Sequence, residues 1–215
     1  MRQQEQQALP SHLDRALDEA ETVQGGVIRY EAEPSGRDRP HHWGRRIALT
    51  LLGALLVAFI GLSGALLVWP AGDRPQHVDG ILSLDGANEH LREQRALGLA
   101  RAGYAHVLLF SEGHYPKVPC PKLPHVEVVC FVPRPARTVG EIEFAARYAA
   151  RHRWHSIMVV PGHTQTSRAR LLLARCFQGR AIVVPAAAPP LLELPYQVAY
   201  EWGALVKALI VDPGC

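Results

Sequence analysis

One long apolar run dominates the pattern of hydrophobic and polar positions. Between positions 47 and 68 no side chain is charged, and only one threonine and one serine are polar. A helix rises about 1.5 Å per residue, so this run is long enough to cross the ~30 Å hydrocarbon layer of a bilayer. Trp43 and Trp69 flank it, where amphipathic rings favour the lipid–water boundary. We therefore predict a transmembrane helix over residues 47–69. The alternative is a buried core helix, but such helices are usually shorter and keep a polar stripe.

The charges on the two sides of this run are unequal. Four arginines precede it, at positions 37, 39, 45 and 46, whereas Arg74 after it lies close to Asp73 and Asp79. Because positively charged residues stay on the cytoplasmic side, we expect a cytoplasmic N-terminus and an extracytoplasmic C-terminal region. The alternative is a cleaved signal peptide, for which the apolar run is too long and begins too late in the chain.

After the apolar run, short stretches rich in isoleucine, leucine and valine alternate with helical patterns. The predicted strands are residues 80–84, 106–111, 126–132, 156–160 and 181–184, and the predicted helices are residues 88–102, 138–152, 164–177 and 195–210. Continuous apolar strands are typical of a sheet that is covered on both faces. Their alternation with helices predicts a parallel, doubly wound sheet with right-handed crossovers. The loop 112–124 holds four prolines and replaces a helix.

These patterns divide the chain into four parts. Residues 1–46 form a polar, largely disordered cytoplasmic tail, and residues 47–69 form a signal-anchor helix. Residues 70–77 are a linker that contains proline and glycine, and residues 78–215 form an extracytoplasmic α/β domain. The roughly 145 residues after the span are enough for one domain with its own core.

Composition excludes several classes of function. The formal net charge is only +3 and the basic residues are scattered, so we expect no nucleic-acid partner. The 11 histidines are also dispersed, and the chain contains neither an H-E-x-x-H nor an EF-hand pattern, so we predict no metal site. The chain has no G-x-G-x-x-G or Walker motif, so the sequence does not identify a cofactor.

All four cysteines follow the apolar run. They are Cys120, Cys130, Cys176 and Cys215. An even number of cysteines on the oxidising side of a membrane predicts two disulfides, and four cysteines allow three pairings. We favour Cys120–Cys130, which would join a loop to a strand, together with Cys176–Cys215, which would hold the C-terminus. Buried free thiols are the alternative.

The predicted fold indicates where a ligand would bind. Doubly wound sheets bind ligands beyond the carboxyl ends of their strands, which selects the loops 85–88, 111–115, 133–141 and 161–168. In the first loop, Gly86 would let backbone N–H groups approach a ligand beside Asp85 and Asn88, and Arg92 follows one helical turn later. The alternative is a simple turn in which Asp85 or Asn88 caps the helix.

The second and third loops carry carboxylates. Ser111, Glu112 and Gly113 suit the wall of a pocket, although a tight turn would explain them equally. Thr138 and Glu141 have the spacing of a capping box, in which the two side chains bind the first amides of a helix. The same spacing would direct a hydroxyl and a carboxylate toward the cleft.

The fourth loop concentrates polar groups where a strand ends and a helix begins. Arg168 together with the amides of the helix N-terminus would bind phosphate or carboxylate, with Gln165 nearby. His163 is a candidate general base, and a solvated loop histidine is the alternative.

Residues 78–184 resemble the YdcF/SanA/ElyC family of bacterial domains through the order and spacing of several motifs. The run 92–103 is similar to the family's arginine-led helix that ends at a glycine, and 107–113 to its strand that ends in Ser-Gly-Gly. The block 138–141 is similar to Thr-x-Glu-Asn, and 159–169 to Thr-Ser-x-x-His-x-x-Arg-Ala. Glu112 stands where the family usually has glycine, Gly140 and Glu141 stand where it often has Glu-Asn, and Gln165 aligns with the family histidine. The run 200–207 and the four cysteines resemble an actinobacterial branch.

The resemblance implies a protein of the bacterial plasma membrane that acts in peptidoglycan precursor metabolism or envelope integrity. We predict a Rossmann-like three-layer α/β domain with a mostly parallel sheet of about five strands, preceded by one transmembrane helix. Arg92 and Arg168 would hold an anionic group of a small molecule or of a lipid-linked envelope precursor. Glu112, Glu141 and His163 are the candidate acid/base residues if a reaction occurs. The alternative is a non-catalytic envelope scaffold or binding protein, which the loss of the aligned histidine favours.

Overall fold

The computed structural model describes residues 42–113, 119–211 and 214–215. The tail predicted to be disordered, as far as residue 41, and part of the proline-rich loop lie outside these residues. Internal contacts divide the chain between Ala48 and Leu49 into two units. The described residues of the first unit belong to the start of helix α2, and the second unit holds the remainder of α2 and the α/β domain.

Helix α2 (His42–Ser63) contains the apolar run and begins five residues before the predicted start of the span. A π-helical turn, η1 (Gly64–Val68), continues it. Within the described residues, the stretch Trp43–Val68 is the one helical segment that is long and apolar enough to cross a membrane, and nearly all of its most apolar part is exposed. The exposure ends in η1, where Leu67 is buried. The last turn of the apolar run therefore packs against protein.

Five strands form one parallel sheet. They are β1 (Gly80–Ser83), β2 (Val107–Ser111), β3 (Glu127–Phe131), β4 (Ser156–Val160) and β5 (Arg180–Val183), in the order β3-β2-β1-β4-β5. The helices between and after them are α3 (Glu89–Arg101), α4 (Thr138–His152), α5 (Thr166–Cys176) and α6 (Leu194–Ile210). The predicted Rossmann-like α/β fold is confirmed, and the bounds of these elements differ from the predicted ones by two residues at most.

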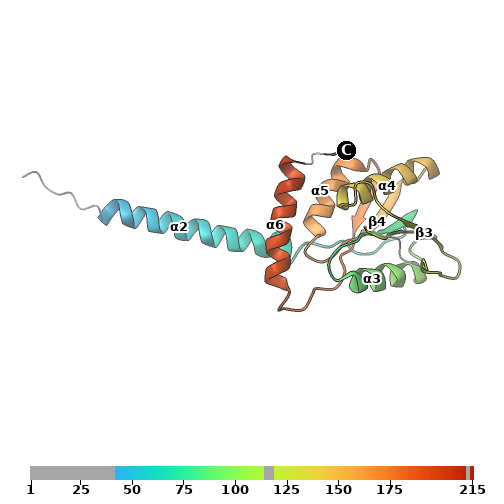
Figure 1. The fold of residues 1–215 in the computed structure, drawn as a ribbon, viewed down its shortest axis with the longest axis horizontal. Coiled ribbons are helices and arrows are strands. Elements are labelled where there is room, and N and C mark those ends of the chain that lie inside the picture. Colours follow the sequence, from blue (N-terminus) through green and yellow to red (C-terminus); the bar gives the residue numbers. More distant parts are fainter. Residues whose placement is uncertain (1–41, 114–118, 212–213) are drawn as a thin grey trace, which may run out of the picture. The chain divides into compact units, whose positions relative to one another are not determined.

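Each face of the sheet has its own core. Leu82, Leu109 and Val159 pack together with residues of α4 and α5. Their strand neighbours, such as Ile81 and Leu108, point to the opposite face and pack with residues of α3. Figure 1 shows α3 on one side of the sheet and α4 and α5 on the other. Because both faces are covered, the strands are apolar at successive positions, as the sequence pattern predicted.

The segment 70–77 is attached to the sheet edge. The backbone N–H of Asp73 donates to the Val183 carbonyl, and the Val183 N–H donates to the Asp73 carboxylate, both at 2.8 Å. The guanidinium of Arg170 also contacts this carboxylate, at 3.1 Å. This stretch was predicted as a linker between the span and the domain, and the contacts hold it against β5.

Both favoured disulfides are present. Cys120, in the proline-rich loop, is bonded to Cys130 of β3. Cys176, the last residue of α5, is bonded to the C-terminal residue, Cys215. No cysteine in the described part of the chain is free. The first disulfide fixes a loop that has no regular secondary structure of its own, and the second ties the chain end to the domain.

Candidate functional site

A cavity lies where the strand order changes direction. The chain runs outward from β1 through β2 to β3 and then returns to the other side of β1 for β4 and β5. Such a switch point leaves a crevice beyond the carboxyl ends of the central strands. The cavity there measures about 310 Å³. Its lining includes the predicted site residues Asp85, Gly86, Asn88, Arg92, Gly113, Thr138, Glu141, His163, Gln165 and Arg168.

Two of the predicted site residues, Ser111 and Glu112, do not belong to this lining. Both are buried, and the backbone N–H of Glu112 donates to the Phe131 carbonyl at 2.9 Å. Ser111 is the last residue of β2 and Glu112 follows it, next to edge strand β3, whereas the cavity lies at the switch point. Among the candidate acid/base residues, the geometry therefore favours Glu141 over Glu112.

Glu141 is a buried carboxyl group in the first turn of α4. Its Oε1 accepts a hydrogen bond of 2.6 Å from the backbone N–H of Asp85, and its side chain is almost fully inaccessible. Burial raises the pKa of Glu141 to about 7 and the charge of Asp85 adds to the rise, while the Asp85 N–H and the Arg92 charge oppose it. Ser111 Oγ makes no hydrogen bond of good geometry among the described residues, so burial is the main cause. A carboxyl group with this pKa can both donate and accept a proton at neutral pH.

The predicted capping box does not form. The N-cap residue of α4 is Arg137, and its side chain makes no capping hydrogen bond. Thr138 Oγ1 instead accepts hydrogen bonds from Gln165 Nε2 at 2.9 Å and from Arg168 Nη1 at 2.6 Å. Because Glu141 contacts Asp85, both side chains of the motif take part in interactions around the cavity. The prediction was wrong about the local bonds, although the same residues do face the cleft.

Arg92 forms part of the cavity floor as a buried cation. Its Nη1 donates to the Ala87 carbonyl at 2.8 Å, and its Nη2 donates to the Gly86 carbonyl. A Cβ added to Gly162 would lie 3.0 Å from Nη1, so the guanidinium also lies close to the loop after β4. Arg92 Nε is buried without a partner among the described residues. Burial lowers the pKa of Arg92, but an arginine side chain keeps its charge in proteins.

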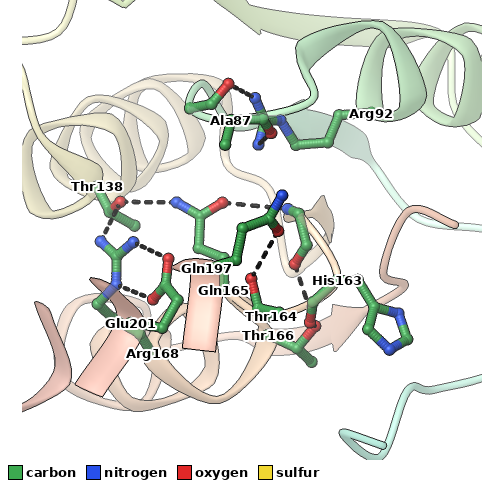
Figure 2. A network of polar contacts seen from close by, with 12 residues as sticks. Ala87, Arg92, Thr138, His163, Thr164, Gln165, Thr166, Arg168, Gln197 and Glu201 are labelled. Carbon is green, nitrogen blue, oxygen red and sulfur yellow. Dashed lines mark hydrogen bonds and ion pairs between the residues drawn. The ribbon is translucent and has the colours of Figure 1, made fainter. Parts of the chain in front are cut away.

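Arg168 is already paired with a carboxylate. Its Nε and Nη2 donate to the two carboxylate oxygens of Glu201, both at 2.9 Å, and Nη1 donates to Thr138. Figure 2 shows the guanidinium between these two partners. Both side chains of the ion pair are mostly buried. The predicted anion-binding arginine thus has an internal partner from α6, with which an anion would compete.

Gln165 and His163 make positioning contacts. Gln165 Oε1 accepts the Gly162 N–H at 3.1 Å, while Nε2 donates to Thr138, so this side chain joins the loop after β4 to α4. His163 Nε2 lies 2.9 Å from the Val68 carbonyl, and in Figure 2 its ring points away from the polar cluster. The histidine proposed as a general base therefore contacts the end of the apolar helix.

Helix α6 completes the cavity, and the sequence analysis assigned none of its residues to the site. Its contributions to the lining include Tyr196, Gln197, Tyr200, Glu201 and Lys207. Gln197 and Glu201 are four residues apart in a helix that is otherwise mostly apolar, so they share one face. This spacing was the available signal that α6 presents a polar stripe to a pocket.

Comparisons with protein-family models, with curated proteins and with solved structures find no match for this chain. In the described residues no group of three or more histidine, cysteine, aspartate or glutamate side chains is arranged to hold a metal ion. The fold and the cavity define a Rossmann-like α/β domain with a polar pocket at its switch point. The resemblance to the YdcF/SanA/ElyC family stays a prediction.

Proposed function

We propose that this protein is a single-pass protein of the bacterial plasma membrane whose extracytoplasmic domain binds an anionic, phosphate-bearing ligand. The observation that carries the proposal is the cavity itself. It brings a buried cation, Arg92, a buried proton donor or acceptor, Glu141, and the N-termini of α4 and α5 to one place. A role in peptidoglycan precursor metabolism or envelope integrity rests on the family resemblance.

The proposed topology is supported by three features. The apolar helix is long enough to cross a bilayer, and the arginines before it favour a cytoplasmic N-terminus. Two disulfides lie in the domain that follows, and disulfides persist in oxidising compartments. The domain would therefore act on the outer side of the membrane.

The preference for an anion follows from the balance of charges in the cavity. The Arg168 charge is neutralised by Glu201, whereas the guanidinium of Arg92 donates to backbone carbonyls and has the carboxyl groups of Asp85 and Glu141 nearby. Helix N-termini add partial positive charge and N–H donors, which favour phosphate. A phosphate group next to Glu141 would also have a group nearby with which to exchange a proton.

Titration of the purified full-length protein with inorganic phosphate and pyrophosphate tests this proposal. We expect Glu201→Gln to strengthen binding about tenfold, because it removes the carboxylate that competes for Arg168, and Arg168→Gln to weaken it by a similar factor. Isothermal titration calorimetry measures both affinities. The matched control is Glu143→Gln, which changes a partly exposed carboxylate of α4 that pairs with Arg147 and does not line the cavity.

The melting temperature of each variant separates a binding defect from a folding defect. If wild-type protein binds neither anion, or if Glu201→Gln folds normally and does not bind more tightly, the anion site is refuted. Binding by the wild type and the control with opposite changes in the two cavity variants would support it.

A non-catalytic scaffold is the second candidate function, and specific contacts favour it. Gln165 stands where the family has a histidine and is engaged with Gly162 and Thr138, while His163 contacts Val68. A scaffold of this kind would need no anion in the cavity. The same titration distinguishes the two functions, because a scaffold predicts no binding of phosphate or pyrophosphate by any variant.

A further inference from the structure

Helix α6 has its polar side inward and its apolar side outward. The inward residues Gln197 and Glu201 are buried against the cavity. The large side chains on the outward side are Val206, Leu209 and Ile210, and Tyr196 and Tyr200 lie beside them at the rim of the cavity; all five are exposed. A helix on the surface of a water-soluble domain shows the opposite arrangement. An apolar face of this kind usually marks an interaction site.

The turn before α6 extends the apolar face. Leu191 and Leu192 are 83% and 96% exposed, so these two side chains have almost no contact with the protein. Within α6 itself the only charged residues are Glu201, which is paired inside, and Lys207. Over the length of this helix the exposed surface therefore carries one positive charge and no negative charge, and Glu193, the exposed N-cap residue, accepts hydrogen bonds from Asn88 and Gln197 of the cavity lining.

The apolar face continues onto the predicted transmembrane helix. The ring of Trp202 stacks on the ring of Phe59, with 5.3 Å between the centroids. Trp202 Nε1 also donates to Ser63 Oγ at 2.9 Å. Phe59 lies in the exposed part of α2, before the turn that packs against the domain. The side of α6 that carries Trp202 is thus in contact with a residue of the apolar helix.

The length of the apolar helix indicates how deep in the bilayer the contact between Phe59 and Trp202 lies. The stretch Trp43–Val68 has 26 residues. It rises about 39 Å, whereas the hydrocarbon layer is about 30 Å thick, which leaves roughly six residues outside that layer. Four of those residues, 43–46, lie at the cytoplasmic end with the two arginines, and the last two lie in the π-helical turn, so the layer extends from about Ile47 to Leu66. Phe59 then lies inside the hydrocarbon layer, about 10 Å from its outer edge.

We propose that the outward face of α6 and the turn at residues 191–192 lie in the lipid–water interface of the same bilayer that the apolar helix crosses. The partner is the lipid surface, and the contact is of the type made by interfacial helices. Tyr196 and Tyr200 have the amphipathic rings that favour this layer, and Lys207 has a stem long enough to carry its ammonium to the head groups. Because α6 also forms a wall of the cavity, this contact would hold the site next to the membrane.

This inference rests on the membrane anchoring in the proposed function, and the test must separate the two. Single cysteines are introduced into the full-length protein at Ile210 and Val206 on α6, at Leu56 in the apolar helix and at Gln94 on exposed α3. Each protein is spin-labelled without reductant, so that the native disulfides persist, and reconstituted in vesicles of phosphatidylethanolamine and phosphatidylglycerol. Electron paramagnetic resonance then measures the accessibility of each label to oxygen and to a water-soluble nickel chelate.

We expect the labels at positions 206 and 210 to be several-fold more accessible to oxygen, relative to nickel, than the label at position 94. If the label at position 56 is protected from nickel but those at 206 and 210 are not, the α6 contact is refuted and the anchor stands. If all labels are exposed to nickel, both are refuted. Dipolar broadening at 206 and 210 that vanishes on dilution with unlabelled protein would identify a second copy of the chain as the occupant and would also refute the lipid contact.

Discussion

At the scale of single residues, the cavity depends on charged side chains that are kept away from water. Arg92 and Glu141 are each at most 2% exposed, and the charge of each acts on the other. Burial disfavours the charged form of this acid more than the Asp85 N–H and the Arg92 charge favour it, which is why the pKa of Glu141 is raised. Buried ionisable groups lower the free energy of unfolding, and such groups are typical of functional sites and not of hydrophobic cores.

The raised pKa of Glu141 predicts a specific dependence of stability on pH. The pKa rises from 4.5 to about 7 on folding, so between these values the folded protein keeps a proton that the unfolded chain has lost. Stability therefore falls as the pH rises through this range, by roughly 3 kcal/mol in total for this group. Glu141→Gln has no charge to bury, so we expect this variant to lose that part of the pH dependence and to be more stable than wild type above a pH of about 7.

Denaturant unfolding of the full-length protein in detergent, at pH values on both sides of this range, measures the effect. Glu143→Gln serves as the control and should keep the wild-type slope, because this carboxylate is partly exposed and pairs with Arg147. Identical slopes for wild type and Glu141→Gln would show that the carboxyl group ionises freely in the folded state.

At the scale of elements, the position of α4 decides how its first residues reach the cavity. Gly140 lies in the first turn of this helix, and a Cβ at that position would be 2.1 Å from the Pro135 carbonyl oxygen and 2.8 Å from the Pro135 nitrogen. Neither backbone atom can move aside without moving the loop after β3. The glycine therefore lets the helix start close to this loop, which brings Thr138 and Glu141 to the switch point.

A substitution of this glycine tests the close approach. We expect Gly140→Ala to reduce the free energy of unfolding by about 1–3 kcal/mol, because the helix and the loop must separate to make room. Gly98→Ala is the matched control. Gly98 also lies inside a helix, α3, but a Cβ there would meet no atom within 4 Å. The control should be stabilised by up to about 1 kcal/mol, since alanine favours helices more than glycine does. Equal effects of the two substitutions in denaturant unfolding would argue against the close approach.

At the scale of the whole molecule, the proposed topology connects the apolar helix, the disulfides and the site. The Cys176–Cys215 bond closes a separation of 39 residues and the Cys120–Cys130 bond a separation of 10. By the loop-entropy argument the longer one stabilises the fold more, by about 4 against about 3 kcal/mol. Both require an oxidising compartment to form and persist.

The topology predicts that all four cysteines are oxidised in the cell. Extraction in the presence of an alkylating agent should leave them unmodified, and modification should appear only after reduction, as mass spectrometry of the intact protein would show. An alkaline phosphatase fused after Cys215 should be active, because that enzyme needs an oxidising compartment for its own disulfides. A C-terminal fusion that is active only in a reducing interior, or four alkylated thiols before reduction, would reverse the proposed orientation.

The sequence by itself determined the elements, the disulfides and the region of the site. Strands were predictable because a strand that is covered on both faces is apolar at successive positions, such as Leu108 and Leu109. Helices were predictable because burial repeats about every 3.6 residues. The number of disulfides followed from the position of the cysteines after the apolar run, whereas the pairing that we favoured was one of three and was settled by the structure. The loops of the cavity followed from a general rule for parallel sheets, which applies once the alternation of elements is known.

Only the tertiary structure decided which side chains meet. Arg168 and Glu201 are 33 residues apart, and nothing in their local sequences indicates that the arginine is already paired. His163 likewise contacts Val68 across 95 residues, so a predicted base became a contact to the apolar helix. The outward direction of the apolar face of α6 also depends on how that helix packs. Local patterns report whether a residue is buried, but partners distant in the chain are set by packing, and the chemistry of this cavity depends on those partners.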